Sequence, residues 1–406
     1  MSKINDLIRE LCPNGVEHKQ LNEIADTLIG LATSVTKHKT SDGVILLHNS
    51  DIKQNKIVLK TIEFIDKGFA DKNVNKYYQY HDIATVHTGD VGTSAVIEEE
   101  YVGSMGFTTL VTRIYDFNYI NPYFLCHYFN SQLFKNDLAR VTISDRSNLN
   151  QKEFCQLLIP IPPLEVQNEI VRILDKFGEL EAELEAELEA RKSQYEFWRG
   201  KLFEVEDAKE IRLDELFNLK NGFTPSKSNN EFWENGTIPW FRMEDIRENG
   251  RILGDSIQHV TVEATKGNIM PANSIIVSTS ATIGEHALIT CESLSNQRFT
   301  YLMLKDEYNN SVDMKYIFYH CFLLDKYCLG NLNQGNFASI DMNAFKKYIF
   351  KIPSLEKQKK IVSILDRFGD LTSNITIGLP AEIELRRKQY EYYRNKLLSF
   401  EELINE

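Results

Sequence analysis

Residues 161–180 read IPPLEVQNEIVRILDKFGEL, and residues 352–371 read IPSLEKQKKIVSILDRFGDL. The two stretches are identical at 13 of 20 positions, at a constant offset of 191 residues. A second block follows each copy, as RKSQYEFWRGKL at residues 191–202 and as RKQYEYYRNKL at residues 387–397. A repeat of this length sets the architecture of a chain. The sequence therefore predicts two units, each a globular segment followed by a helical repeat, in a pseudo-twofold molecule suited to a bipartite target or to two copies of a partner.

Both helical repeats open on proline and continue with a helical stripe. Pro162-Pro163 precedes the first, and Pro353-Ser354 precedes the second, where Ser354 suits an N-cap. The apolar residues at helical spacing are Ile170, Ile173, Leu174, Phe177, Leu180, Leu184 and Leu188, and then Ile361, Ile364, Leu365, Phe368 and Leu371. We expect these two stripes to pack on each other as a coiled coil.

The first helical repeat contains the unit ELEA three times, at residues 179–190. Its leucines recur every four residues, so the stripe turns by about 40° per step and cannot form a regular coiled-coil seam. Two interpretations stay open for this strongly helix-favouring segment: a solvated acidic helix face, and a spacer of defined length. The second repeat instead contains Gly378-Leu379-Pro380, which predicts a break or kink in the helix.

Charge and composition restrict the class of protein. The net charge of the 406-residue chain is −12, and residues 158–207 carry 6 basic and 13 acidic side chains. The globular segments are nearly balanced, so bulk charge gives no support for a nucleic-acid groove. No apolar run approaches the roughly 20 residues of a membrane span, and the N-terminus has no signal-peptide pattern. Six scattered cysteines are typical of reduced thiols, so we expect a cytoplasmic protein.

The two globular segments show mixed strand and helix patterns and resemble each other weakly. Residues 83–86 and 274–277 read as strands. Asp51-Ile52 follows a short strand, as Asp245-Ile246 does, and further glycine and apolar positions match. Two modules with a shared scaffold and different surface loops are what two different targets would require.

Motifs that carry catalysis are missing from the sequence. It has no phosphate-binding GxxxxGK[ST], no GxGxxG, no HExxH and no GxSxG. Asn121-Pro-Tyr-Phe124 approaches the catalytic tetrapeptide of adenine-N6 methyltransferases but lacks its second proline, so we interpret it as an Asn-Pro helix start. His81, Asp82, His87 and Asp90 are close in sequence, yet a metal site is the less favoured interpretation. The sequence thus favours a binding protein over an enzyme.

Polar loops in both segments carry side chains that suit DNA. Arginine, asparagine and glutamine make bidentate contacts with guanine and adenine, and lysine and serine suit phosphates. Such loops are also frequent as plain turns, and that interpretation stays open for each loop. The candidate DNA-binding residues are Arg146 and Asn148 in the first segment, and Lys220, Thr224, Ser226, Lys227, Arg242, Asn333, Gln334 and Asn336 in the second.

The duplicated blocks resemble the specificity subunits of type I restriction–modification systems. The second segment adds the matching motifs, which are residues 222–226 (GFTPS), residues 236–240 (GTIPW), Asp245-Ile246, residues 281–284 (ATIG) and Asn296-Gln297. The first segment keeps only traces, such as Asp51-Ile52 and Gly92, and it lacks the Asn-Gln pair. Each motif is short by itself, whereas the ordered duplication is highly specific and covers the whole chain.

The resemblance implies an α+β fold. It has two α/β target recognition domains, separated by two long helices that pack as an antiparallel coiled coil with pseudo-twofold symmetry. The corresponding regions are 1–160 for the first recognition domain, 161–207 for the central helical repeat or spacer, 208–350 for the second recognition domain and 351–406 for the C-terminal helical repeat.

The resemblance also implies a function without catalysis in this chain. Each recognition domain would read one half of an asymmetric, interrupted sequence in double-stranded DNA, and the helices would set the spacing. Two methyltransferase subunits would bind the flanks and methylate adenine at N6, and restriction subunits would add cleavage. S-adenosylmethionine, ATP and Mg²⁺ would belong to these partners, and no cofactor to this chain. Candidate contacts with the methyltransferase subunits are Tyr195, Trp198, Tyr390 and Tyr393, unless these aromatics only fill the helix core.

Two other functions compete with this prediction. A stand-alone adenine methyltransferase would need a cofactor loop and an intact catalytic tetrapeptide, and the sequence has neither. A coiled-coil scaffold for protein partners, without DNA contact, fits the net charge of −12. Binding of DNA that weakens with added salt would separate a DNA-recognition subunit from such a scaffold.

Overall fold

The computed structural model describes residues 2–32, 35–141, 149–333, 339–373 and 378–403. The chain forms two compact units. The first unit consists of Met1–Glu185 with Glu382–Glu406, and the second unit consists of Ala186–Ala381. Each unit therefore combines one globular segment with helices from both repeats.

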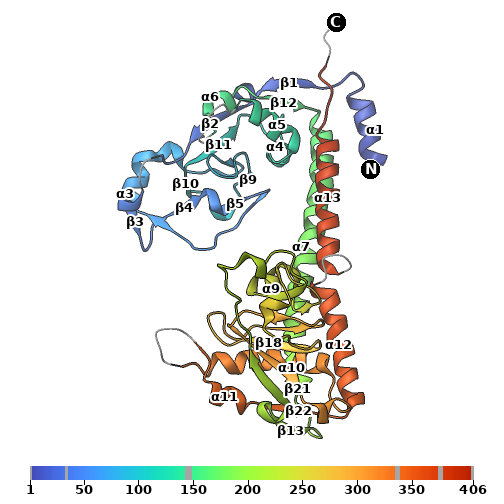
Figure 1. The fold of residues 1–406 in the computed structure, drawn as a ribbon. Coiled ribbons are helices and arrows are strands. Elements are labelled where there is room, and N and C mark those ends of the chain that lie inside the picture. The colour runs from blue at the N-terminus through green and yellow to red at the C-terminus, as the bar shows by residue number, and fades with distance from the viewer. Residues whose placement is uncertain (1, 33–34, 142–148, 334–338, 374–377, 404–406) are drawn as a thin grey trace. The chain divides into compact units, whose positions relative to one another are not determined.

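Two four-stranded sheets form the globular part of the first unit, among its described residues (Figure 1). The strands in the order of the inner sheet are β2 (Ala25–Ile29), β11 (Thr109–Ile114), β8 (Ile83–Val86) and β9 (Ser94–Val96). The outer sheet runs β10 (Met105–Phe107), β4 (Val44–His48), β7 (Phe64–Ile65) and β3 (Lys39–Thr40). Two antiparallel pairs complete the unit: β1 (Glu17–Gln20) with β12 (Leu158–Ile161), and β5 (Ile52–Lys53) with β6 (Lys56–Ile57).

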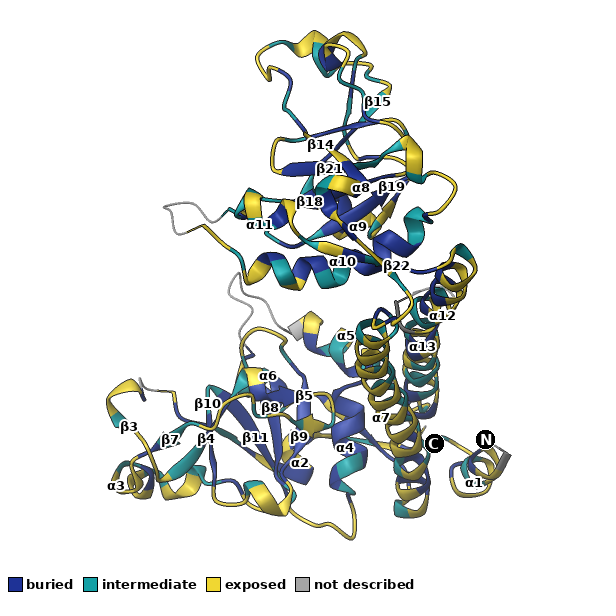
Figure 2. Ribbon diagram, turned by 90° about the horizontal axis from the view of Figure 1, so that it is seen from below, coloured by how far each residue is buried: buried dark blue, intermediate teal, exposed yellow. Residues whose placement is uncertain are grey.

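Short helices complete the first unit. They are α1 (Ser2–Leu11), α2 (Leu21–Ile24), α3 (Lys67–Ala70), α4 (Pro122–Phe129), α5 (Gln132–Val141) and α6 (Gln151–Phe154), with 3₁₀ turns at Thr36–His38, Asn49–Asp51, Asp71–Lys76 and Glu99–Tyr101. The Asn-Pro helix start is confirmed, because the Asn121 side chain accepts from the backbone N–H groups of Tyr123 (2.8 Å) and Phe124 (3.2 Å) and caps α4. Figure 2 shows β8, β11 and α4 as the buried centre of the unit.

The second unit repeats this scheme with a five-stranded and a three-stranded sheet, among its described residues. The first runs β14 (Phe217–Asn221), β21 (Phe299–Leu304), β18 (Ser274–Ser278), β19 (His286–Ile289) and β16 (Ile252–Leu253). The second runs β17 (His259–Val260), β15 (Ile238–Phe241) and β20 (Leu294–Ser295), and β13 (Lys209–Arg212) pairs with β22 (Ile349–Ile352). The helices are α8 (Leu213–Leu216), α9 (Met243–Asn249), α10 (Met314–Leu329), α11 (Met342–Lys346) and α12 (Leu355–Ser373), with 3₁₀ turns at Asn230–Phe232, Glu263–Thr265 and Asp306–Tyr308.

The predicted kinship of the two segments is confirmed by strand order and by single contacts. The order β2-β11-β8-β9 in the first unit matches β14-β21-β18-β19 in the second. Gln167 and Gln358 stand at the same place in the two helical repeats. Each amide donates to the carbonyl of the proline five residues earlier and accepts the backbone N–H of a helix cap, Asn121 or Asp313, with 2.8 Å for every one of these bonds.

The helical repeats differ as Gly378-Leu379-Pro380 predicts. The first repeat is one continuous helix, α7 (Leu164–Lys201), which passes from the first unit into the second. The second repeat is divided into α12, which belongs to the second unit, and α13 (Leu379–Leu397), which from Glu382 belongs to the first. Among the described residues, no helix is both long and apolar enough to cross a membrane.

The apolar stripes are shared between two partners, whereas the sequence suggested that they pack only on each other. Ile170 and Leu174 are completely buried and join the core of the first globular segment. Ile361 and Leu365 do the same in the second unit, where α12 packs on α10. The reason is that each globular core, which contains α4 in the first unit and α10 in the second, has an apolar surface that would otherwise be exposed. The first turns of each helical repeat cover this surface. Leu180, in the first ELEA unit, is 36% exposed.

Further along the repeats the helices pair with each other. In the first unit the ring of Phe177 on α7 lies 5.4 Å from that of Tyr393 on α13. About one turn later on α7, Glu181 binds Arg387 at 2.6 Å. Because the residue number rises on one helix and falls on the other, the pair is antiparallel. In the second unit, Tyr195 of α7 stacks on Phe368 of α12 at 6.0 Å.

Candidate nucleic-acid interface

An open hollow of about 310 Å³ lies on one edge of the second unit, where β15 and β20 end and the GFTPS loop begins. Three of the sequence-predicted DNA residues, Thr224, Lys227 and Arg242, line it together. The sequence reasoning did not choose its other polar lining residues, which are Glu244, Asn296, Gln297 and Arg298. The Asn-Gln pair was visible as a motif, but nothing in its sequence context marked it as part of a site.

Buried Asp245 fixes the position of Arg242 at the rim of this hollow. Its carboxylate accepts the backbone N–H groups of Arg242 and Ile257, both at 2.6 Å, and it is completely buried. The guanidinium of Arg242 lies over the ring of Trp240, 5.7 Å from its centroid, and pairs with Glu244 at 3.1 Å. The backbone of Arg242 is fixed by Asp245 and its guanidinium by the Trp240 ring. The guanidinium N–H donors therefore keep one direction, as base recognition requires.

The GFTPS loop and the Asn-Gln pair contact each other directly. A Cβ on Gly222 would come within 2.4 Å of the carbonyl oxygens of Ser295 and Asn296, so only glycine allows this approach. The Thr224 hydroxyl donates to the Gln297 side-chain oxygen at 2.5 Å. Gln297 and Arg298 are exposed. The edge thus presents arginine and amide side chains that are anchored at their bases.

Asn333 lies on the same edge, but in this conformation its side chain forms hydrogen bonds within the protein. Its side-chain NH₂ donates to the Ile340 carbonyl at 3.1 Å and to the Ser339 hydroxyl at 3.3 Å, which closes the base of a loop. The loop itself, with Gln334 and Asn336, lies outside the described residues. Ser339 pairs with Ser280, and Thr279 donates to the backbone oxygen of Arg298 at 2.9 Å, so Ser339 lies near the hollow.

The two remaining candidates of the second segment lie on the margin of this edge. Lys220 is exposed on β14 and pairs with Tyr301 of β21. The Ser226 hydroxyl bonds to that of Ser228 at 2.8 Å, and its carbonyl accepts the Trp233 indole N–H at 3.0 Å. Both positions suit phosphate contacts better than base contacts, since neither lines the hollow.

In the first unit, Arg146 and Asn148 lie outside the described residues. The corresponding edge is nevertheless visible, and Asn49 is at its centre. The Asn49 amide donates to the Thr88 carbonyl and to the Thr108 hydroxyl, both at 3.2 Å, and its oxygen accepts the His87 N–H at 3.4 Å. Leu149 donates to the His87 carbonyl at 3.0 Å and so lies at this edge. Burial lowers the pKa of His87 below its ordinary value.

The sequence reasoning missed the polar residues of this first edge, although one signal could have found them. Asp51 accepts the backbone N–H of His48 at 2.8 Å, just as Asp245 accepts that of Arg242. The residue three positions before each aspartate therefore occupies the same place at the rim. His48 is the counterpart of Arg242, and its ring pairs with Glu63 at 2.9 Å.

The histidines and aspartates that are close in sequence do not converge on a common point. Asp82 binds Arg113 at 2.7 and 2.9 Å, and the His81 ring stacks on Tyr80 at 3.8 Å. His87 contacts Thr88, and Asp90 accepts the Thr93 hydroxyl. Throughout the described ranges, no group of three His, Cys, Asp or Glu side chains could hold a metal ion.

The aromatic residues of the second block fall into two groups. Tyr195, Tyr390 and Tyr393 face the partner helix and stack on Phe368 or Phe177. Trp198 is 39% exposed, and Phe197 and Tyr392 are each 60% exposed. Phe197 and Tyr392 occupy the same place in the two repeats, two residues after Tyr195 and Tyr390. The sequence reasoning did not select this pair, although the repeat makes it visible.

Comparison with known proteins agrees with this arrangement. The type I restriction modification DNA specificity domain matches residues 13–190 and 205–385. The EcoprrI specificity subunit of Escherichia coli is 52% identical over 210 residues, which are 50% of this chain and 52% of that protein. The EcoR124I/EcoR124II specificity subunit of Escherichia coli is 37% identical over 63% of this chain and 65% of its own length. The chain thus matches between about half and two thirds of these relatives.

Other relatives cover more of the chain. A putative type I specificity subunit of Haemophilus influenzae is 34% identical over 69% of this chain and 73% of its own. Among solved structures, the fold is similar to a chain described under complex assembly and conformational transition of the type I R-M system (TM-score 0.66, 17% identity, 95% and 98% coverage). It is also similar to the HsdS subunit of Thermoanaerobacter tengcongensis (TM-score 0.53, 16% identity, 96% and 97% coverage). The chain therefore belongs to the family of specificity subunits of type I restriction–modification systems, which are non-catalytic DNA-recognition subunits.

Proposed function

We propose that this chain reads an asymmetric, interrupted DNA sequence, one half with each globular segment, on behalf of methyltransferase and restriction subunits. The observation that carries the proposal is a pair of polar edges at equivalent places of two related segments. The first edge presents His48, Asn49 and Thr108, and the second presents Arg242 and Gln297. One scaffold with two different sets of side chains suits two different half-sites.

The chemistry of the second edge favours purines. Arginine pairs with the O6 and N7 acceptors of guanine, and glutamine pairs with the N6 and N7 groups of adenine. Arg242 and Gln297 are therefore the base readers that we propose for this half, with Arg298 beside them. Lys220, Ser226 and Lys227 would contact phosphates, which fix register without reading sequence. Arg146 and Asn148, and likewise Gln334 and Asn336, remain proposed base contacts, although they lie outside the described residues.

The acidic repeat supports the second half of the proposal, which is spacing. Glu179–Ala190 lies within the continuous helix α7, which leaves one unit and enters the other. A helix has a fixed rise of about 1.5 Å per residue. We therefore propose that the number of ELEA units sets the separation of the two half-sites on DNA.

The exposed aromatic pair suggests where the partners bind. Large apolar side chains that are 60% exposed on two equivalent helix surfaces suit the same protein partner bound twice. We propose that two methyltransferase subunits bind there, one around Phe197 and Trp198 and one around Tyr392. Restriction subunits would join this complex. S-adenosylmethionine, ATP and Mg²⁺ would be bound by these partners, and the complex would act on DNA in the cytoplasm.

Substitutions in one segment test the reading by halves. Gln297→Ala or Gln334→Ala should relax the target only in the half read by the second segment, whereas Arg146→Ala should relax only the other half. Each lost bidentate contact costs about 1–3 kcal/mol of discrimination. Sequencing of methylated adenines after each exchange measures this directly. A uniform loss over all sequences would identify phosphate contacts instead, and the absence of salt-sensitive DNA binding would favour a protein scaffold.

A further inference from the structure

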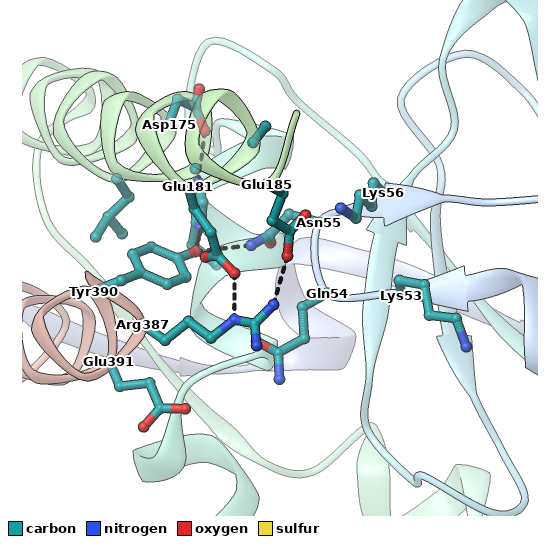
Figure 3. Close-up of a pocket in the computed structure, with 14 residues that line it drawn as sticks. Lys53, Gln54, Asn55, Lys56, Asp175, Glu181, Glu185, Arg387, Tyr390 and Glu391 are labelled. Carbon is teal, nitrogen blue, oxygen red and sulfur yellow. Dashed lines mark hydrogen bonds and ion pairs between the residues drawn. The ribbon is translucent and has the colours of Figure 1, made fainter. Parts of the chain in front are cut away.

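A hollow of about 580 Å³ separates the globular segment of the first unit from its helices (Figure 3). The β5–β6 hairpin forms one side, and α7 and α13 form the other. Arg387 of α13 reaches across to Glu181 and Glu185 of α7 at 2.6 and 2.5 Å. The first turns of α7 join the apolar core of the segment through Ile170 and Leu174, whereas beside the hollow polar links connect the hairpin to the helices.

A chain of hydrogen bonds crosses at the edge of this hollow. The Asn55 side-chain NH₂, at the tip of the hairpin, lies 2.9 Å from the Tyr390 hydroxyl of α13. That hydroxyl lies 3.2 Å from His127 Nδ1 on α4, and His127 Nε2 lies 2.9 Å from Asp175 on α7. The chain therefore connects the hairpin, α13, α4 and α7 in sequence.

With a neutral His127 ring, the donors and acceptors of this chain agree in one direction only. Asn55 donates to the Tyr390 oxygen, so the Tyr390 hydroxyl proton is directed to His127 Nδ1. Nδ1 is then the acceptor nitrogen, and the proton on Nε2 faces the Asp175 carboxylate. Burial raises the pKa of Tyr390 to about 12, which keeps its hydroxyl protonated. Every member is used, and removal of one hydroxyl interrupts the whole chain.

The hairpin tip is itself rigidly held in the globular segment. Asn55 has a φ of 59°, in the left-handed region that asparagine tolerates better than most residues. Its backbone N–H donates to the Ser94 carbonyl at 2.9 Å, and its side-chain oxygen accepts the Asn130 amide at 2.8 Å. Next to it, Gln54 accepts a guanidinium N–H of Arg394 at 2.9 Å. A change of contact at the tip is thus transmitted to the sheet and not absorbed by the hairpin.

The equivalent position of the second unit shares part of this arrangement. Arg199, the counterpart of Arg394, lies over the rings of Phe322 (4.0 Å) and Tyr195 (5.1 Å). Tyr195 belongs to the apolar packing of that unit. Ring contacts tolerate small shifts, whereas a hydrogen bond weakens steeply when its geometry changes. Tyr390 packs on the core of the first unit in the same way and carries Arg394 over its ring at 5.0 Å, and its hydroxyl in addition bonds to Asn55. This hydrogen bond is thus the contact of the first unit that is most sensitive to geometry.

We propose that Asn55 and Tyr390 are positioning residues for DNA recognition. Their hydrogen bond fixes the orientation of the first globular segment on its helices. It thereby determines how strictly the complex requires one spacing between the two half-sites. The inference rests on the proposed reading of a bipartite target. Neither residue needs to touch DNA. A segment that is released from this bond still reads its own half-site but accepts it at a shifted distance.

The test uses the full chain with its methyltransferase subunits and a plasmid library of targets whose spacers are one base pair shorter, native, or one base pair longer. Tyr390→Phe removes one hydroxyl, and Asn55→Gly removes the amide while it keeps a positive φ accessible. Tyr123→Phe is the matched control, because its hydroxyl binds Glu98 at 3.0 Å within the globular segment. Methylation at each spacer is counted by sequencing, and thermal unfolding of each variant is recorded in parallel.

Tyr390→Phe and Asn55→Gly should each raise methylation at altered spacers, relative to the native spacer, by about fivefold. This is the change in an equilibrium constant that the loss of one hydrogen bond of about 1 kcal/mol produces. The half-site sequences and the profile of Tyr123→Phe should match the wild type. Equal loss of methylation at all spacers would assign the two residues a merely structural role and overturn the inference. A wild-type chain that directs no methylation at a bipartite target would overturn the proposed function instead.

Discussion

Removal of Glu187–Ala190 deletes one ELEA unit from α7 and should shorten the spacer of the DNA target. Four helical residues correspond to a rise of about 6 Å and to a net rotation of about 40°. Base pairs stack at about 3.4 Å, so the separation of the half-sites should fall by about one or two base pairs. The half-site sequences themselves should not change, because both globular segments keep all their residues.

The structure indicates that the shortened helix stays intact. Arg191 pairs with Glu187 at 3.3 Å and Lys192 with Glu189 at 2.8 Å, four and three residues back. After the deletion, the repeat brings Glu183 four residues before Arg191 and Glu185 three residues before Lys192. Such exposed pairs contribute only about 0.3–0.5 kcal/mol each. The bonds of Arg387 to Glu181 and Glu185 lie before the deletion and hold α13 as before.

Sequencing of methylated adenines, with the full chain and its methyltransferase subunits, measures the new spacer. The matched control exchanges Glu187–Ala190 for four alanines, which keeps the length and removes the charge. The control should retain the original spacer. Unchanged spacing with full methylation after the deletion would refute the spacer function. Failure of the alanine control alone would instead assign the segment the role of a solvated acidic face.

Three further predictions concern single side chains. Gln297→Ala should lower the discrimination between bases at one position of one half-site by about 1–3 kcal/mol. Arg298→Lys, which keeps the charge, should leave that position specific. Methylation sequencing compares the two variants. Phe197→Ala and Tyr392→Ala should each release one methyltransferase subunit, since exposed aromatic anchors often contribute about 2 kcal/mol or more; unchanged mass of the complex in both variants would contradict this. His320 is buried, and burial lowers its pKa to about 4. As the pH falls, the unfolded chain therefore binds a proton at this histidine before the folded chain does. The free energy of unfolding should fall between about pH 6.5 and pH 4, by up to about 3 kcal/mol. His320→Gln should flatten this part of the curve of unfolding free energy against pH, and an equally steep curve would exclude His320 as the cause.

The sequence predicted those features that depend on local chemistry or on repetition. The duplicated blocks predicted two related units, and Gly378-Leu379-Pro380 predicted the end of the continuous helix, because proline and glycine act on the backbone next to them. Asn121 was identified as a helix cap for the same reason. The family followed from the ordered motifs, and the comparisons confirm it.

The partners of the helices and the residues of the first edge could not be predicted. An apolar stripe indicates that a helix face is buried, but it does not identify the element that packs on that face. The burial of Ile170 and Leu174 under the globular segment was therefore missed. Asn49 and Thr108 come from distant loops without periodicity, and only the fold brings them together. The hydrogen bond between Asn55 and Tyr390 joins residues 335 positions apart for the same reason.

Methylation sequencing of DNA from cells that contain the methyltransferase subunit, with and without this chain, tests the central claim most directly. The account predicts N6-methyladenine within one asymmetric sequence of two halves and a fixed gap, and only when the chain is present. The same methylation pattern without the chain, or methylation of a short uninterrupted sequence, would contradict it.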